Sequence, residues 1–198
     1  MTNNQNKPRN VFIDLGAGSG DDIKGYFALA PENKTHEVFA FEVNPARIDQ
    51  IKKRYPTSTV YNAAAGIYDG AGALYLGQTL NGSSLNSAKR NVTSTSIVVT
   101  IVDLCKWLKD NFTQDDNITM VMDIEGAEYE LLGQMIKEDL WPWIDQFYVE
   151  FHGPKIANFD MGIERNYVNQ LIDFFGDRVY IYQYHQHEQF CKLNHEGL

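Results

Sequence analysis

The chain has 198 residues, of which 43% are hydrophobic and 13% aromatic, which fits one globular domain and excludes a disordered chain. The formal net charge of −9 opposes non-specific nucleic-acid binding, which needs basic side chains against phosphates, so we expect a small-molecule partner and no nucleic acid. No apolar run approaches the roughly 20 residues that cross a bilayer, and the polar start MTNNQNKPRN lacks a signal-peptide core. Two cysteines are too few for a disulfide framework. We therefore expect a cytoplasmic protein without a membrane segment.

Strand-like and helix-like segments alternate along the chain. Residues 1–10 are polar and predict a flexible arm, and residues 11–198 predict a single domain. The first part of the chain predicts a strand at Val11–Leu15, a helix at Asp21–Leu29, a strand at Glu37–Glu42, a helix at Pro45–Arg54 and a strand beginning at Ser58. The middle part predicts a β-extension at Gly72–Gly77, a strand at Ser96–Val102, a short helix at Asp103–Asn111 and a strand at Ile118–Ile124. The last part predicts a helix beginning at Ala127, a strand at Asp145–His152, a helix at Ile163–Gly176 and an aromatic hairpin from Arg178. This alternation predicts a doubly wound α/β fold with a mostly parallel sheet and helices on both faces.

Some details of these elements are also predicted. In the helix beginning at Ala127, the apolar spacing places Leu131, Leu132, Met135 and Ile136 against the core. The polar segment Thr79–Asn91 predicts a mobile loop, and its pair Lys89-Arg90 is interpreted as solvated. Together with Gly153–Gly162, this loop is a candidate segment for substrate specificity.

The stretch DLGAGSGDD follows the first strand and predicts a nucleotide-binding loop. Its glycines are Gly16, Gly18 and Gly20, whereas the dinucleotide fingerprint needs a glycine at the position of Asp21. A pyrophosphate at this helix start would face Asp21 and Asp22, and like charges repel at close range. S-adenosylmethionine carries a sulfonium cation and no phosphate, so nearby carboxylates favour it.

Polar residues also end the other strands, and ligands of such sheets bind at the carboxyl ends of the strands. Glu42 ends the second strand, where a carboxylate can accept hydrogen bonds from ribose hydroxyls. NAD enzymes share that device, so Glu42 alone leaves both cofactors open. Asp123 ends a later strand, and Glu150 and His152 end the next one, on the same face if the strand continues.

The chain resembles the FkbM family of S-adenosylmethionine-dependent methyltransferases. The resemblance rests on VFIDLGAGSG, AFEVNP, GSSL, VTIVDL, MDIEGAEYELL and VEFH, in the family's order over Val11 to His152. It implies a Rossmann-like methyltransferase fold, here expected to have a mostly parallel seven-stranded sheet with an antiparallel C-terminal hairpin. It also implies methylation of a hydroxyl on a small molecule or sugar. The cofactor-binding residues inferred from these blocks and strand ends are Asp14, Gly16, Ala17, Gly18, Ser19, Gly20, Glu42, Val43, Asn62, Ala63, Ala64, Ser84 and Asp123, with Asn62 to Ala64 beside the adenine.

The chain departs from the family's pattern at three places. Gly18 stands where the family commonly has Asn, and Val43 stands where it commonly has Pro. The family usually has Lys before I-D-x-E-G, whereas this chain has Met122 directly before Asp123. The last departure removes a cation near the strand end.

The candidate catalytic residues are Asp123, Glu150 and His152. A hydroxyl becomes a good nucleophile when a base takes its proton, and His152 has the ordinary pKa best suited to neutral pH. The three side chains could alternatively hold Mg²⁺, although their spacing does not require a metal, and we expect none. Two other functions stay open: a nicotinamide-dependent oxidoreductase, and a module that binds S-adenosylmethionine without turnover.

Overall fold

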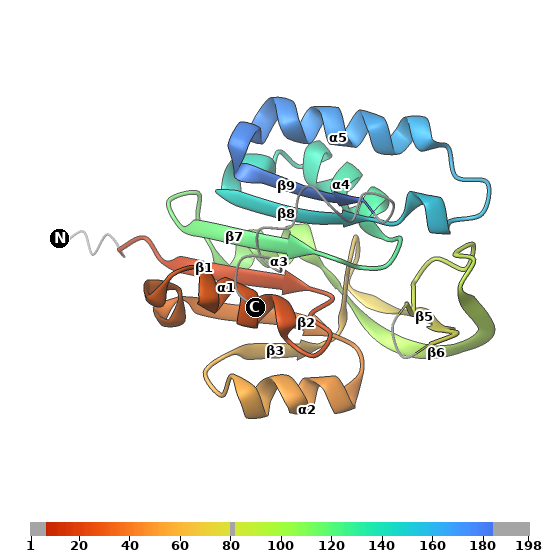
Figure 1. Cartoon of the computed structure of the whole chain (residues 1–198), viewed down its shortest axis with the longest axis horizontal. Coiled ribbons are helices and arrows are strands. Elements are labelled where there is room, and N and C mark those ends of the chain that lie inside the picture. The colour runs from red at the N-terminus through yellow and green to blue at the C-terminus, as the bar shows by residue number, and fades with distance from the viewer. Residues whose placement is uncertain (1–6, 80–81, 184–198) are drawn as a thin grey trace.

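The computed structural model describes residues 7–79 and 82–183, which form two β-sheets flanked by helices (Figure 1). The main sheet has six strands in the order β3-β2-β1-β7-β8-β9, and all its neighbours run parallel. Its strands are β1 (Asn10–Leu15), β2 (Glu37–Glu42), β3 (Thr59–Asn62), β7 (Asn117–Met122), β8 (Gln146–Phe151) and β9 (Val179–Gln183). The strand order reverses between β1 and β7, and ligands of open α/β sheets bind in the crevice at such a point.

The second sheet has three strands and lies beside the carboxyl edge of the main sheet, at the right of Figure 1. Its strands are β4 (Ala64–Gly66), β5 (Gly70–Gly77) and β6 (Val92–Asp103). The central strand β6 pairs parallel with β4 and antiparallel with β5. Both outer strands come from the chain that directly follows β3, so this sheet is an insertion between β3 and β7.

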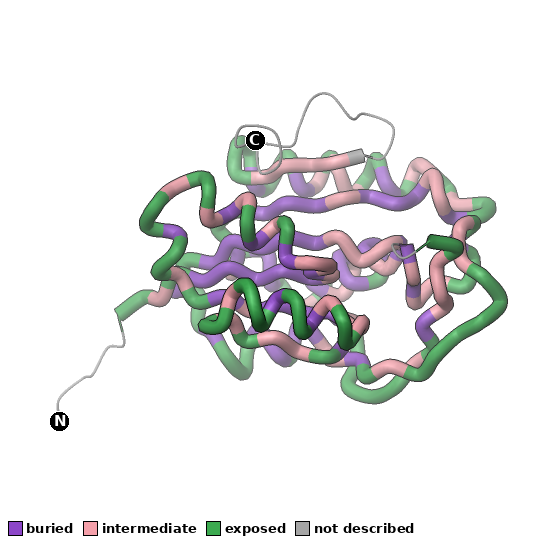
Figure 2. The backbone as a smooth tube through the Cα atoms, turned by 60° about the horizontal axis from the view of Figure 1, so that its bottom comes forward, coloured by how far each residue is buried: buried purple, intermediate pink, exposed green. Residues whose placement is uncertain are grey.

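Side chains of β1 alternate between two hydrophobic clusters, as the two-residue period of a strand requires. Val11, Ile13 and Leu15 pack in one cluster, and Phe12 packs in the other, where its ring stacks on Tyr26. The first cluster includes side chains from α3 (Leu104–Asn111), α4 (Glu128–Lys137) and α5 (Met161–Phe175), and the second from α1 (Asp21–Leu29) and α2 (Pro45–Arg54). The buried strands between exposed helix faces are visible in Figure 2, so helices cover both faces of the main sheet.

Three helices begin at side-chain caps. The side chains of Asn44, Asp103 and Asp160 accept hydrogen bonds from the backbone at the first turns of α2, α3 and α5. Pro45 occupies the first helical position of α2, where its missing N–H costs nothing. Short 3₁₀ turns complete the described helices, at Pro31–Thr35, Trp141–Trp143, Gly153–Lys155 and Gly176–Arg178.

The predicted seven-stranded sheet is wrong, because the main sheet has six strands in the part of the chain described. The first half of the predicted hairpin is β9, which pairs parallel with β8 at the edge of the main sheet. The second half of the predicted hairpin, from Tyr184, lies outside the described residues. The predicted third strand divides at Ala63 into β3 and β4, which belong to different sheets.

Two further details differ from the sequence analysis or extend it. Leu131, Leu132 and Met135 are buried as predicted, but Ile136 is wrong as a core residue, since it is 37% exposed. Strand β1 begins at Asn10, and the guanidinium of Arg9 donates hydrogen bonds to the Glu37 carboxylate at 2.8 and 2.9 Å. Residues 1–6 of the predicted arm lie outside the described residues.

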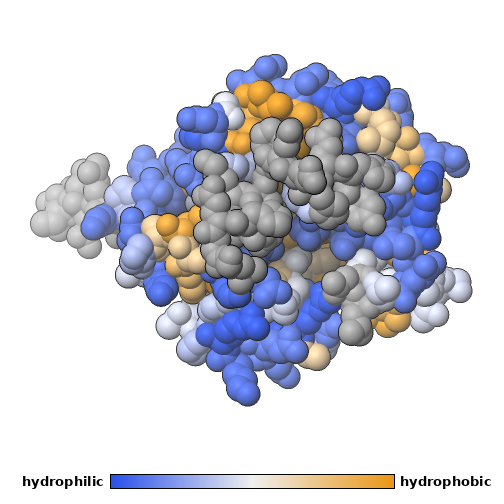
Figure 3. Space-filling model, viewed as in Figure 1, coloured by the Kyte–Doolittle hydropathy of each residue, from blue (hydrophilic) through white to orange (hydrophobic). Residues whose placement is uncertain are grey.

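The surface and the helices agree with the composition. Away from the grey atoms, the face in Figure 3 is mostly hydrophilic, with separate hydrophobic patches. Among residues 7–79 and 82–183, every helix is too short or too polar to cross a bilayer.

Candidate functional site

A cavity of about 490 Å³ opens at the carboxyl ends of β1, β2 and β7. Its volume lies within the range of small-molecule sites. Leu74, Leu76 and Ile97 of the second sheet form an apolar part of its wall. The predicted cofactor residues that line it are Gly16, Ala17, Gly18, Ser19, Glu42, Val43, Ala63, Ala64 and Asp123.

Four predicted cofactor residues do not line the cavity. Asp14 is buried behind it, and Gly20 is the left-handed cap of α1. Asn62 is exposed at the end of β3. Ser84 is 1% exposed, and its hydroxyl donates to the Glu125 carbonyl at 2.7 Å. Ser84 therefore holds the loop to the turn after β7.

Gly16 joins the first loop to the end of β7. Its φ is +88°, and an added Cβ would lie 1.9 Å from the Asp123 carbonyl oxygen. The amides of Gly16 and Ala17 both donate to the Phe41 carbonyl of β2 at 3.0 Å. The first glycine is therefore required by contact with the neighbouring strand end, independently of any ligand.

Glu42 is held by the backbone around it. Its carboxylate accepts hydrogen bonds from the amides of Gly18 at 2.8 Å, Val43 at 2.9 Å and Asn44 at 2.7 Å. Two of these bonds reach Oε1 and one reaches Oε2, so Oε2 keeps acceptor capacity for a ligand. Since Glu42 lines the cavity and is 6% exposed, it is a fixed acceptor beside Gly18.

Asp14 is a buried carboxyl group without a hydrogen bond. It is 1% exposed, and neither oxygen has a hydrogen-bond partner among the described residues. Burial raises its pKa well above the ordinary range, and the neighbouring carboxylates of Asp22, Asp123 and Glu42 raise it further. Asp14 is therefore costly to ionise in the absence of a cation, because it is buried beside three other acids.

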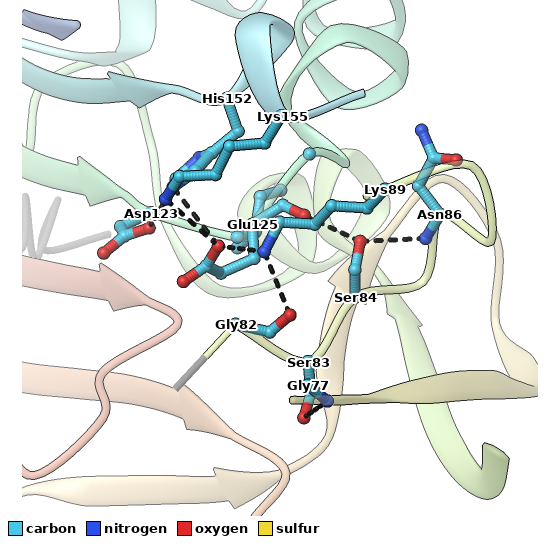
Figure 4. Close-up of polar contacts among 12 residues, drawn as sticks. Gly77, Gly82, Ser83, Ser84, Asn86, Lys89, Asp123, Glu125, His152 and Lys155 are labelled. Carbon is cyan, nitrogen blue, oxygen red and sulfur yellow. Dashed lines mark hydrogen bonds and ion pairs between the residues drawn. The ribbon is translucent and has the colours of Figure 1, made fainter. Parts of the chain in front are cut away.

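His152 lies at the centre of a second group of acids, at the end of β8 (Figure 4). Its Nδ1 is 2.9 Å from Glu128 Oε1. Its Nε2 lies 3.3 Å from Glu125, 3.4 Å from Glu150 and 3.6 Å from Asp123. The structure thus brings together the three predicted catalytic residues.

The charge of His152 follows from these contacts. Burial lowers its pKa, but the hydrogen bonds to Glu128 and Glu150 and the charges of Glu128 and Asp123 outweigh burial and raise the pKa to about 10. These contacts favour the imidazolium form at neutral pH, which cannot accept a proton. They therefore favour one of the neighbouring carboxylates over His152 as the base.

The surroundings of Asp123 make its carboxylate a candidate for the base. Its side chain is 35% exposed and lines the cavity, while Oδ1 is enclosed without a hydrogen bond. Burial raises its pKa well above the ordinary range, Glu150 raises it further, His152 opposes that rise, and Glu125 and Glu128 add to it. A carboxylate with a raised pKa is a better base than an ordinary one at neutral pH.

Glu125 is a neighbouring carboxylate whose pKa is shifted the other way. Burial raises its pKa, but His152, Lys89 and Lys155 together outweigh burial and lower it. Its φ of +57° is in the left-handed region, which is unusual for a residue other than glycine. Glu125 also lines the cavity.

Lys89 is a site residue that the sequence analysis missed. Its interpretation as solvated is wrong, since its side chain is 0% exposed and its ammonium group pairs with the Glu125 carboxylate. The described part of the predicted mobile loop is tied down as well: Arg90 N donates to Lys155 O, and Ala157 N donates to Ala88 O. Lys89 and Lys155 therefore supply cations at the strand end where Met122 had suggested a loss of charge.

A metal fits this group poorly. Asp123, Glu128 and His152 each present a ligand atom within 4.8 Å of one another. However, Glu128 Oε1 already contacts His152 Nδ1 at 2.9 Å and the Gly126 amide at 3.0 Å, and the Lys89 ammonium group pairs with Glu125, which also contacts His152. A divalent cation would have to displace these contacts close to an ammonium group, so we derive no step through a metal.

A comparison with family models gives a match over most of the chain. A family model described as "Methyltransferase FkbM domain" matches residues 14–183. Comparison with curated proteins gave no match. Among solved structures, the chain is similar to a methyltransferase FkbM from Methylobacillus flagellatus KT, with 14% identity and a TM-score of 0.49; the match covers 85% of this chain and 38% of that one, so the chain spans well under half of that protein. The family match extends over most of the chain, from Asp14 to Gln183, and the chain belongs to the FkbM methyltransferase family.

Proposed function

We propose that the protein transfers a methyl group from S-adenosylmethionine to a hydroxyl oxygen of a small molecule or glycan. The observation that carries this proposal is the group of acids around the cavity: Asp123 lines it and Asp14 is buried behind it, and each has an enclosed oxygen that lacks a hydrogen bond. A cation bound near such acids lowers the cost of ionising them, and a sulfonium or an α-ammonium group is such a cation. A pyrophosphate does not, because Asp21 and Asp22 line the same cavity, which argues against a nicotinamide cofactor.

The remaining wall suits the neutral part of such a cofactor. The Glu42 carboxylate can accept from ribose hydroxyls through its free capacity at Oε2. Ala63 and Ala64 leave space for a flat ring, with Leu74, Leu76 and Ile97 as apolar neighbours. The group bound there supplies an electrophilic methyl carbon, and the protein's part is to hold the acceptor in line and to remove its proton.

We assign the base to Asp123, with Glu150 as the alternative. In the assigned step, the Asp123 carboxylate would accept the proton of the acceptor hydroxyl as the hydroxyl oxygen bonds to the methyl carbon, and the carbon–sulfur bond would break with its electron pair left on sulfur, so that a neutral thioether leaves. A cation nearby lowers the pKa of Asp123 and so favours the ionised form that the step requires. His152 remains an imidazolium that holds the surrounding carboxylates in place.

The acceptor is expected beside Asp123 and Glu125. The two segments predicted to set specificity meet there, since Lys89 and Ile156 form an isolated β-bridge next to Glu125. We therefore assign the acceptor pocket to the junction of these segments.

Calorimetric titration with S-adenosylmethionine, S-adenosylhomocysteine and NAD tests the proposal. We expect binding of the first two and no binding of NAD. Binding of NAD alone would favour the oxidoreductase. Binding of both sulfur compounds without S-adenosylhomocysteine production, across a panel of hydroxyl acceptors including sugars, would favour the non-catalytic module.

A further inference from the structure

We propose that Lys89 is a positioning residue that orients the Glu125 carboxylate at the floor of the cofactor cavity and connects it to the loop forming the cavity wall. The inference rests on the proposed function, because it assigns Lys89 a role toward the bound cofactor. Figure 4 shows the Lys89 ammonium group between Glu125 and Gly82.

The side chain of Lys89 is buried. A lysine is almost never fully enclosed unless it is paired, and this side chain is 0% exposed. Its ammonium group donates to the Gly82 carbonyl at 2.9 Å and to the Glu125 carboxylate. A buried charge with both a carbonyl and a carboxylate partner is a specific arrangement, since removal of either partner leaves a charge without compensation.

Both partners of the Lys89 ammonium group lie at the cavity. Gly82 and Glu125 line it, although they are far apart in the sequence. Gly82 has a φ of +98°, and an added Cβ would lie 3.4 Å from the Lys89 ammonium nitrogen. The ammonium group therefore packs closely under the backbone that forms one wall, while it also holds the floor.

The same loop contacts Glu125 a second time. Ser84 Oγ donates to the Glu125 carbonyl at 2.7 Å and accepts from Asn86 N at 3.0 Å. Backbone and side chain of Glu125 are thus both fixed by the loop. Because the backbone of Glu125 is in a left-handed conformation, these contacts also stabilise a strained turn.

Lys89 acts within a group of charges that must be considered together. The charged groups around the Glu125 carboxylate come from five places: Lys89 in the loop, Asp123 at the end of β7, Glu128 at the start of α4, Glu150 and His152 at the end of β8, and Lys155 in the following turn. If Asp123 holds a proton, three negative and three positive charges remain. Loss of the Lys89 charge leaves an excess negative charge and makes Glu125 easier to protonate.

The test compares the binding of S-adenosylmethionine, a cation at sulfur, with that of S-adenosylhomocysteine, which lacks this charge. The ratio of their affinities, measured calorimetrically from about pH 4 to pH 8, reports ionisation of the acids near the sulfur. In Lys89→Met, we expect the midpoint of this pH dependence to move upward by about one unit. Lys89→Arg keeps the charge and should keep the wild-type midpoint.

Three further variants separate charge from structure. Lys89→Gln keeps a donor for the Gly82 carbonyl but removes the charge, so it should reproduce the shift even if Lys89→Met does not fold. In Glu125→Gln, a second change of Lys89→Met should no longer move the midpoint, because the group that it acts on is gone. Lys106→Met, at a helical lysine whose side chain is 62% exposed, is the matched control and should leave the midpoint unchanged.

Two results are distinguishable failures. If the wild-type protein binds neither sulfur compound, the proposed function is wrong. If it binds both, and Lys89→Met or Lys89→Gln keeps the wild-type midpoint, the role of Lys89 is wrong while the function stands. A shift of equal size with and without Glu125→Gln would also contradict this role.

Discussion

The two ends of the cavity hold their carboxylates in different ways. At the β2 end, Glu42 accepts three backbone hydrogen bonds from residues next to it or from the first loop. At the β7 end, Asp123 has an oxygen without a hydrogen bond, and the acids around it are balanced by His152, Lys89 and Lys155. The first end is a preformed acceptor for neutral hydroxyl groups, whereas the second is an electrostatic balance that an added cation or proton can change.

The largest expected effect comes from a substitution at Gly16, which contacts both the end of β2 and the end of β7. Gly16→Ala places a Cβ on the Asp123 carbonyl in a left-handed backbone, so we expect a loss of about 3 kcal/mol or more of unfolding free energy. Urea denaturation measures it. Gly18→Ala is the control, because its φ is also positive but the nearest atom to an added Cβ lies 3.6 Å away; equal losses in both variants would contradict the contact with Asp123.

The charge balance at the β7 end predicts an unusual titration of His152. Its pKa is raised to about 10 from an ordinary value of about 6.5. The stabilisation that it contributes is therefore complete below about pH 6.5 and is lost as the pH rises through about 10. NMR titration of the imidazole measures this pKa directly, and Glu128→Gln should lower it. An imidazole that titrates near pH 6.5 in the wild-type protein would restore His152 as a candidate base.

The β2 end predicts a direct loss of affinity. Glu42→Ala removes a charged acceptor from the cavity wall and leaves the amides of Gly18, Val43 and Asn44 without their partner. We expect S-adenosylhomocysteine binding to weaken by about 1–3 kcal/mol. Calorimetry on a variant whose circular dichroism matches the wild type measures the change, and unchanged affinity would remove Glu42 from the site.

Asp14 is expected to lower the stability of the ligand-free protein and to favour the binding of a cationic ligand. Its pKa is raised in the folded state, so the folded protein loses stability relative to the unfolded chain as the pH rises above the ordinary carboxyl value of about 3.9. Asp14→Asn should raise the unfolding free energy of the ligand-free protein at neutral pH by about 1 kcal/mol or more. A higher thermal midpoint would show this gain. The same variant should weaken the binding of S-adenosylmethionine more than the binding of S-adenosylhomocysteine. A destabilised variant with unchanged preference would contradict both expectations.

The smallest expected effect concerns metals. Because His152 carries a proton and two lysines lie near the same acids, EDTA should leave S-adenosylhomocysteine affinity and thermal stability unchanged. Restoration of lost binding by added Mg²⁺ would show that the group of acids holds a metal after all.

Much of the main sheet could be predicted from the sequence, because its signals are local. The helices at Asp21–Leu29 and Pro45–Arg54 and the strand at Glu37–Glu42 are confirmed at both ends. Capping residues such as Asn44 mark these boundaries within a few positions. The strands of the second sheet were predicted in part, as the β-extension at Gly72–Gly77 and the strand at Ser96–Val102, but their separation from the main sheet was not. The first residues of β6 were missed because they are largely exposed and lack the buried pattern that identifies a strand.

The site was predictable to the same extent. Residues that line the cavity through their backbone, such as Gly18 and Val43, follow from the loop pattern. Lys89 did not, because its charge is enclosed only when the loop meets the turns after β7 and β8. The protonation of His152 also depends on Glu128 in the first turn of α4, and only the folded chain brings these two residues together.

The left-handed backbone at Glu125 has a consequence for substitution at this position. Glycine or asparagine would occupy that conformation more easily, so replacement of Glu125 by glycine should relax the turn while it removes the carboxylate that pairs with Lys89. The same replacement would leave a buried ammonium group without its counterion. The turn therefore carries a backbone cost for which the ion pair with Lys89 compensates.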